Sequence, residues 1–203
     1  MLDERGPVMS IPSFPPPTAS RRAARADTTQ ADRVRAAMDT HYDAVWRFVR
    51  HLGVVSADVE DAVQKVFLVF ARRVTSIDIG AERLFLFATA VRVASDARRQ
   101  RARSRESLAD ANDEAIDAID PAPSVEQTID DRRLRRLLDE VLDTLSEEHR
   151  EVLVLVDIEE QTMAEASEVL GIPKGTVASR LRRARELFES SANDLKSKLE
   201  KEV

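Results

Sequence analysis

The chain has 203 residues, of which 43% are hydrophobic and 33% charged, with a formal net charge of -6 and no cysteine. This composition supports one or two domains with buried cores, and the lack of cysteine excludes disulfides, thiolate metal sites and a Cys nucleophile. No apolar run approaches the roughly 18 to 20 residues that cross a membrane, and the N-terminus lacks the apolar stretch of a signal peptide. We therefore expect a cytoplasmic protein without membrane insertion.

The charge is distributed unevenly along the chain. Residues 21–105 carry 17 Lys or Arg against 10 Asp or Glu, whereas residues 106–131 carry none against 9. This acidic segment also contains two prolines and shows no sustained helical stripe. We predict that it is a flexible linker, with a transient helix at residues 111–119 as the alternative for part of it.

The remaining composition predicts an all-α fold, because aromatic residues are few and alternating segments are scarce. We expect two small helical domains on either side of the acidic linker, at residues 30–105 and 132–190. Residues 1–29 hold five prolines followed by arginines and are predicted to form a disordered tail. A basic arm that touches nucleic acid is the alternative for that tail.

The first domain begins with a predicted helix at residues 32–51, which Gly53 ends. A second helix is predicted from Ala57 or Asp58, as the cap, to Arg73. Its apolar positions form one stripe, and the opposite face carries Asp61, Gln64, Lys65 and Leu68. Such a face suits either solvent or a partner helix, and the pattern alone leaves both open.

The third helix is predicted at residues 82–103. Its first half is apolar on nearly all sides, which indicates burial. One sector of the helical wheel holds Phe85, Thr89, Arg92, Asp96, Arg99 and Arg103. An aromatic ring and several guanidinium groups on one face have the chemistry that holds a nucleic-acid strand single. The alternative is a core Phe with arginines that extend to solvent at a helix end.

The second domain contains a predicted helix-turn-helix at residues 161–185, with Gly171 in the turn. Thr176, after Gly175, is predicted to cap the second helix. That helix has a core stripe of Val177, Leu181, Ala184 and Phe188 and an opposite face of Ser179, Arg182, Arg183 and Glu186. The basic face predicts insertion into the major groove of DNA, against the alternative of a solvated face on a helical hairpin. Residues 191–203 are predicted to add a short helical tail.

Catalytic chemistry is not expected. The three histidines, His41, His51 and His149, are scattered, and no nucleophile is paired with a base. We therefore expect neither an enzyme nor a metal or cofactor site.

Two segments resemble one protein family. The run from Asp61 to Phe67 is similar to the polymerase-binding signature of region 2 in sigma-70 family transcription initiation factors of the extracytoplasmic-function (ECF) group. Residues 84–99 resemble the strand-opening helix of that group, and residues 145–185 resemble region 4. The resemblance covers residues 34–105 and 132–190, in the family's order and spacing.

This resemblance implies a function for each surface. Region 2 is expected to bind core RNA polymerase through Asp61, Gln64, Lys65 and Leu68, and to hold the opened minus-ten element on the stripe of the third helix. Region 4 is expected to read the minus-thirty-five element of promoter DNA. The residues expected to make that contact are Lys174, Thr176, Ser179, Arg180, Arg182 and Arg183. The acidic linker is expected to imitate RNA in the polymerase channel, and an anti-sigma factor is an expected partner.

Four positions depart from the family pattern. Lys65 replaces an acidic residue, Phe85 a tryptophan, Arg92 an asparagine, and Ala178 a residue that is often basic. The sequence therefore leaves promoter identity open. It also leaves two alternatives: a helix-turn-helix regulator, whose receiver domain would need α/β alternation that is not seen, and an inert module that binds polymerase or an anti-sigma factor.

Overall fold

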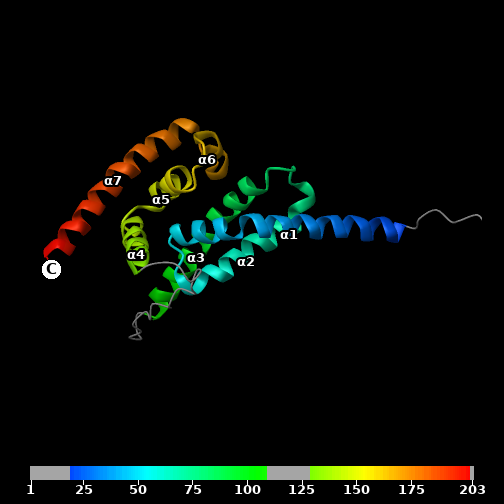
Figure 1. Ribbon diagram of the computed structural model, residues 1–203, viewed down its shortest axis with the longest axis horizontal. Helices are drawn as coiled ribbons and strands as arrows, with labels where there is room; N and C mark the ends of the chain where they lie inside the picture. The colour runs from blue at the N-terminus through cyan, green and yellow to red at the C-terminus, as the bar shows by residue number, and fades with distance from the viewer. Residues whose placement is uncertain (1–18, 109–128, 202–203) are drawn as a thin grey trace, which may run out of the picture.

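The computed structural model describes residues 19–108 and 129–201, and every element in these two ranges is helical. Figure 1 shows their arrangement. In chain order the elements are α1 (Ala19–His51), α2 (Ser56–Arg73), the short 3-10 turn η1 (Val74–Ser76), α3 (Glu82–Leu108), α4 (Ile129–Asp143), α5 (Glu147–Leu153), the π-helical turn η2 (Val154–Ile158), α6 (Met163–Leu170) and α7 (Lys174–Lys201). None of the described helices is both long and apolar enough to span a bilayer.

Helices α1, α2 and α3 form the first domain around an apolar core. The predicted inner stripe of α2 is buried, and the rings of Phe48 on α1 and Phe87 on α3 stack with centroids 4.6 Å apart. Aromatic pairs at this separation add stability beyond the area that they bury. The apolar first half of α3 thus lies between α1 and α2, as its composition predicted.

Helices α4 to α7 form the second domain, and the predicted helix-turn-helix is confirmed as α6, a turn and α7. Thr162 and Glu165 make a capping box at the start of α6, in which each side chain bonds the other residue's backbone N–H. Gly171 ends α6 in the left-handed conformation (φ 66°) that a side chain disfavours. Val177, Leu181 and Ala184 are buried, so the core stripe of α7 is also confirmed.

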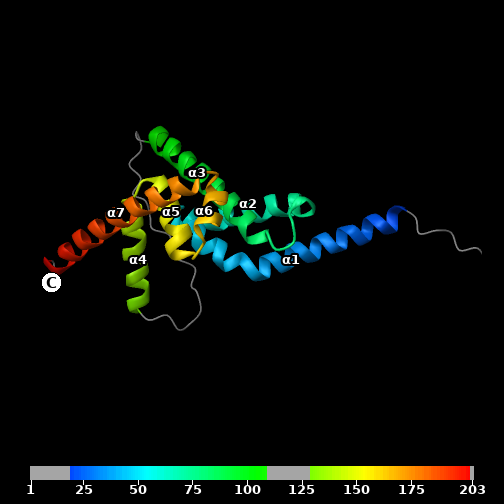
Figure 2. The ribbon, with the colours of Figure 1, turned by 90° about the horizontal axis from the view of Figure 1, so that it is seen from above.

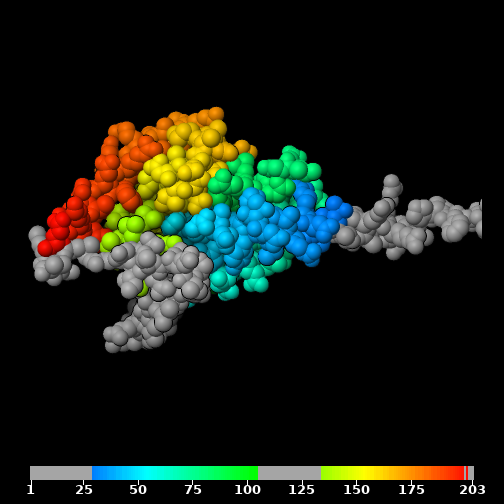
Figure 3. All heavy atoms as spheres, in the orientation of Figure 1, coloured from blue at the N-terminus to red at the C-terminus, as the bar shows by residue number. Residues whose placement is uncertain are grey.

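The two domains pack against each other. One hydrophobic cluster includes Leu52 and Val54, which follow α1, together with Leu142 and Val152 from α4 and α5. In both ribbon views α6 lies beside α3 (Figures 1 and 2). The space-filling view shows the atoms of the second domain directly against those of α1 and α3 (Figure 3). The sequence analysis had left the relative placement of the domains open.

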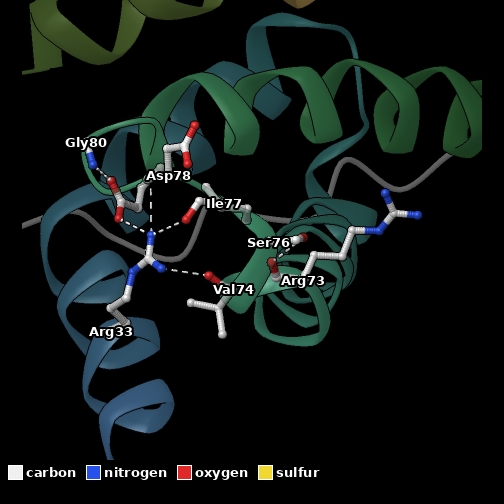
Figure 4. A network of polar contacts seen from close by, with 8 residues as sticks. Arg33, Arg73, Val74, Ser76, Ile77, Asp78 and Gly80 are labelled. Carbon is white, nitrogen blue, oxygen red and sulfur yellow. Dashed lines mark hydrogen bonds and ion pairs between the residues drawn. The ribbon is translucent and has the colours of Figure 1, made fainter. Parts of the chain in front are cut away.

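A single arginine of α1 forms hydrogen bonds with the connection between α2 and α3. Arg33 donates to the carbonyl oxygens of Val74 and Ile77 at 2.7 and 2.8 Å, and it pairs with the Glu82 carboxylate at 2.7 Å (Figure 4). Glu82 also accepts from the backbone N–H of Gly80. The Arg33 hydrogen bond is the main reason that the pKa of Glu82 is lowered. These contacts fix the loop that leads into the start of α3.

Several predicted helix boundaries were wrong. Helix α1 begins at Ala19 rather than residue 32, because the preceding residues are Ala- and Arg-rich and lack a Gly or Pro that would stop a helix. Helix α2 begins at Ser56 with Val55 at the cap position, so Asp58 lies inside the first turn. Thr176 lies inside α7, not at its cap, and its N–H donates to the Pro173 carbonyl.

Other differences concern the linker and the tail. Helix α3 continues to Leu108 and α4 begins at Ile129, so helices enter both ends of the expected linker. Its centre, residues 109–128, lies outside the described residues, as do residues 1–18 of the expected N-terminal tail. Helix α7 runs unbroken into the predicted helical tail and ends at Lys201.

Candidate nucleic-acid interfaces

The stripe on α3 has an exposed end and a buried beginning. The Asp96 and Arg99 side chains are 80% and 66% exposed, and Arg92 and Arg103 are exposed as well. These residues lie at spacings of three and four, so their side chains follow one another along one face. The structure therefore provides a solvent-facing row of three guanidinium groups and one carboxylate on α3.

Phe85 and Thr89 lie at the core edge of this stripe. The Phe85 ring is half-buried and tilted against Phe70, with centroids 6.1 Å apart. Thr89 is only 6% exposed, and its hydroxyl donates to the Phe85 carbonyl at 2.8 Å. The ring can offer only part of its surface to a base. The Thr89 hydroxyl is engaged inside the helix and lies off the exposed row.

The recognition face of α7 carries two exposed arginines around one glutamate. Arg182 and Arg183 donate to different oxygens of Glu186 at 3.0 and 2.9 Å. Their side chains are 75% and 57% exposed, and such surface pairs contribute little stability. Both guanidinium groups can therefore leave Glu186 for a phosphate or a base edge at small cost.

The other predicted contact residues of α7 are placed differently. Lys174 and Ser179 are exposed, and the Ser179 hydroxyl donates to the Thr176 carbonyl at 3.0 Å. Arg180 is mostly buried and pairs with Glu148 of α5 at 2.9 Å. Within the domain, Arg180 thus ties α7 to α5, whereas its neighbours Ser179 and Arg182 point to solvent.

Arg185 belongs to the same basic run but has a structural contact that the sequence analysis missed. Its guanidinium makes two hydrogen bonds to the Asp157 carboxylate, at 2.9 and 2.6 Å. Asp157 lies in η2, 28 residues earlier in the chain. These two hydrogen bonds fix the position of α7 against η2. The spacing of the two residues in the sequence does not predict that they pair.

The outer face of α2 is free for docking among the described residues. Asp61, Gln64 and Lys65 are exposed, and Leu68 on the same face is 49% exposed. Nearby, a shallow hollow between α1 and α2 exposes the apolar side chain of Met38.

Metal binding finds no support in the described part of the chain, where no three His, Asp or Glu residues converge. His51 lies at the end of α1, and burial lowers its pKa, so the imidazole is favoured in its neutral form.

Both domains match families of known proteins. The family model described as sigma-70 region 2 matches residues 37–104, and the one described as sigma-70, region 4 matches residues 135–188. The ECF RNA polymerase sigma factor SigE of Mycolicibacterium smegmatis is 34% identical over 146 residues, which are 72% of this chain and 56% of that protein. SigL of Mycobacterium tuberculosis, also an ECF RNA polymerase sigma factor, is 30% identical over 162 residues, covering 79% of this chain and 89% of SigL.

Two solved structures share the fold. The sigma factor RpoE of Bartonella quintana, in complex with the anti-sigma factor NepR, aligns with a TM-score of 0.61 and 20% identity, covering 78% of this chain and 96% of RpoE. CnrH, in complex with the cytosolic domain of CnrY, aligns with a TM-score of 0.59 and 23% identity, covering 85% of this chain and 95% of CnrH. At these identities the likeness concerns the fold alone.

Proposed function

Because the chain belongs to the ECF group of sigma-70 family factors, we propose that it binds core RNA polymerase and directs it to specific promoters. The observation that carries this proposal is the pair of exposed basic rows on α3 and α7, one in each domain. The chain spans 56% of SigE and 89% of SigL, the two relatives compared above. It supplies binding surfaces and no catalytic chemistry, and it acts in the cytoplasm with polymerase.

Each surface has a separate task. Asp61, Gln64, Lys65 and Leu68 on α2 dock onto core polymerase, because an exposed Leu among polar anchors suits a helix-to-helix contact. Arg92, Asp96, Arg99 and Arg103 hold the backbone of the opened minus-ten strand, and the exposed part of Phe85 stacks on a base. Thr89 positions Phe85 through its hydrogen bond and makes no DNA contact of its own.

Region 4 reads the minus-thirty-five element in the duplex. Arg182 and Arg183 reach base edges or phosphates once they leave Glu186, while Lys174, Thr176 and Ser179 contact the backbone near the start of α7. Arg180 contributes only if its pair with Glu148 opens. An anti-sigma factor is a further partner, in line with the complex of RpoE with the anti-sigma factor NepR.

The proposal is tested by transcription with purified core polymerase across a promoter library. The parent should initiate on a subset of promoters. Asp61→Arg combined with Gln64→Ala should weaken core binding, while Arg35→Ala, at an exposed position of α1, serves as the control. Wild-type affinity of the double variant in a pull-down would reject the docking face.

Strand opening separates an initiating factor from an inert binding module. Phe85→Ala with Arg92→Ala should form closed complexes yet fail to open DNA, because base stacking is worth roughly 1 to 3 kcal/mol per base. Permanganate reactivity of unpaired thymines reports the opening, after cooperative melting has shown that the variant folds. Undiminished reactivity would place the strand elsewhere, and a parent that opens no promoter in the library would favour the inert module.

A further inference from the structure

The recognition face of α7 contains one carboxylate, that of Glu186, among its basic residues. Residues 174–185, which begin α7, include five Lys or Arg and no Asp or Glu. Glu186 follows directly and accepts from Arg182 at 3.0 Å and from Arg183 at 2.9 Å, through a different oxygen each time. The bond from Arg183 is the main reason that the pKa of Glu186 is lowered. The carboxylate is therefore ionised where the two arginines are presented.

Helix stability does not account for this arrangement. The Glu186 side chain is 45% exposed and its two partners are more exposed still, and ion pairs at such positions contribute little. Their order is also the weaker one, because an acidic residue supports a helix better when it precedes its basic partner than when it follows it. The other two arginines of this stretch, Arg180 and Arg185, pair with carboxylates of other elements. Glu186 instead belongs to the outward-facing set.

The spacing along α7 places Glu186 beside the bases that its partners read. It lies three residues beyond Arg183 and four beyond Arg182, so the three side chains share one face of the helix. The rise over this distance is about 4.5 to 6 Å, whereas successive base pairs are about 3.4 Å apart. A helix with these arginines against base edges therefore has the carboxylate one to two base pairs further on. This step rests on the proposed function, in which α7 reads the duplex.

The arginines and the carboxylate need new partners when α7 enters a major groove. An arginine donates two hydrogen bonds to O6 and N7 of guanine, whereas a carboxylate only accepts and requires an amino group. Cytosine presents its N4 amino group without a neighbouring acceptor, but adenine presents its amino group beside the N7 acceptor, and guanine and thymine present acceptors. Cytosine is thus the base that best satisfies a carboxylate. Against other base edges or a phosphate, the Glu186 carboxylate faces negative charge.

We propose that Glu186 is a specificity-determining residue of the recognition face. Its carboxylate accepts from the N4 amino group of a cytosine that lies one to two base pairs from the guanine read by Arg182 or Arg183. A duplex with both bases gives new partners to both sides of the ion pairs, and other duplexes leave the carboxylate without a suitable donor. Glu186 also cancels one of the two positive charges of the arginines, which weakens the sequence-independent attraction to phosphates.

Selection from a promoter library with a randomised upstream element tests this assignment. The full chain is used alone and with core polymerase, and the bound duplexes are sequenced. The parent should enrich a cytosine next to the guanine contacts, and replacing that one base pair should weaken binding about five- to a hundredfold. Glu186→Ala should lose this preference but keep the guanines, and it should bind an unrelated duplex about three- to tenfold more tightly at about 0.1 M salt.

Glu186→Gln provides a change of preference that misfolding cannot imitate. A glutamine amide pairs with N6 and N7 of adenine, so the enriched base should change from cytosine to adenine at that position only. Asp194→Ala removes the same charge from an exposed position of α7 and serves as the control, which should retain the cytosine. Cooperative melting checks that each variant folds.

An unchanged preference in Glu186→Ala, or the same loss in Asp194→Ala, would overturn the assignment. An even loss of preference at every position would also overturn it, because Glu186 would then act only by orienting the arginines. A full chain that selects cytosine through Glu186 but does not bind core polymerase would support the assignment and contradict the proposed function. A parent that enriches no upstream sequence but initiates on a promoter would overturn the assignment and leave the proposed function standing.

Discussion

At the residue scale, Arg33 shows how one side chain organises a loop. Its planar guanidinium reaches three carbonyl oxygens, those of Val74, Ile77 and Asp78, and one carboxylate of the α2–α3 connection. These acceptors would otherwise need water or remain partly unpaired, and an unpaired buried acceptor costs more than a hydrogen bond contributes. Lysine could not satisfy them together, because its ammonium lacks the fixed fork of donors.

We predict that Arg33→Ala lowers the free energy of unfolding by about 2 to 3 kcal/mol, and that Arg33→Lys recovers less than half of that loss. Urea denaturation measures both, with Arg35→Ala as the matched control two residues away on the exposed surface. Equal stability of Arg33→Ala and Arg35→Ala would mean that the α2–α3 connection keeps its conformation without Arg33.

At the element scale, α5 presents its carboxylates to one guanidinium. A hydrogen bond with Ser95 lowers the pKa of Glu147 most, and the bond from Arg98 lowers it further. Burial and the negative charge of Glu147 raise the pKa of Glu151 to about 7, which outweighs the attraction of Arg98 and Arg180. The cluster therefore favours one ionised carboxylate and one that takes up a proton near neutral pH.

This assignment predicts a pH dependence of stability. The folded protein keeps the Glu151 proton between about pH 4.5 and 7, where the unfolded chain has released it. The stability linked to Glu151 is therefore complete below pH 4.5 and is lost as the pH rises through about 7. His51, with its lowered pKa, acts in the opposite direction, so the decisive quantity is the difference between parent and Glu151→Gln.

Thermal melting from pH 5 to 8 measures that difference. Glu151→Gln should gain stability relative to the parent as the pH rises, and reach a plateau above about pH 7. A constant difference at every pH would show that Glu151 does not titrate in this window. Glu168, an exposed carboxylate on α6, offers Glu168→Gln as the control.

Helix α7 makes a second prediction at this scale. Arg182→Ala and Arg183→Ala should each weaken binding to the upstream element by about 1 to 3 kcal/mol if the arginines reach base edges. Binding to an unrelated duplex should then change less. Equal losses on both duplexes would assign them to phosphates, and the salt dependence of binding would fall with each removed contact.

At the scale of the whole molecule, substitutions at two glycines distinguish the effect of backbone strain from the effect of a lost contact between the domains. Gly53 and Gly80 both have positive φ, at 82° and 92°, but a Cβ at Gly80 meets no atom within 4 Å. Both alanine variants bear the backbone strain, of order 1 to 3 kcal/mol. Only Gly53→Ala also displaces Arg150, which donates to the Leu52 carbonyl, so it should lower the free energy of unfolding by more than Gly80→Ala in urea denaturation. Equal losses in the two variants would contradict a stabilising contact of Arg150 with the first domain.

Much of this architecture could be predicted from the sequence, because each helix buries one periodic stripe. The inner face of α2 and the core stripe of α7 follow directly from spacings of three and four. The long-range contacts of Arg33, Arg98 and Arg150 could not be predicted, because these partners lie 41 to 98 residues away and include backbone carbonyls. Thr89 was expected on the exposed stripe of α3 but is buried. A helical wheel gives the direction of a side chain but not how far the neighbouring helices cover it.

The unbroken length of α7 has a mechanical consequence. Its 28 residues make a rod of about 42 Å, with the recognition arginines toward one end and, toward the other, an apolar groove shared with α4 and lined by Phe188 and Leu195. Leu195 lies 12 residues, or about 18 Å, beyond Arg183. Arg185 and the buried residues Leu181 and Ala184 hold α7 at its recognition end, so a tilt of about 10° about that end moves Leu195 through about 3 Å, roughly the length of one hydrogen bond. A small change in the tilt of α7 on DNA is therefore converted into a measurable displacement at the groove that its far end shares with α4.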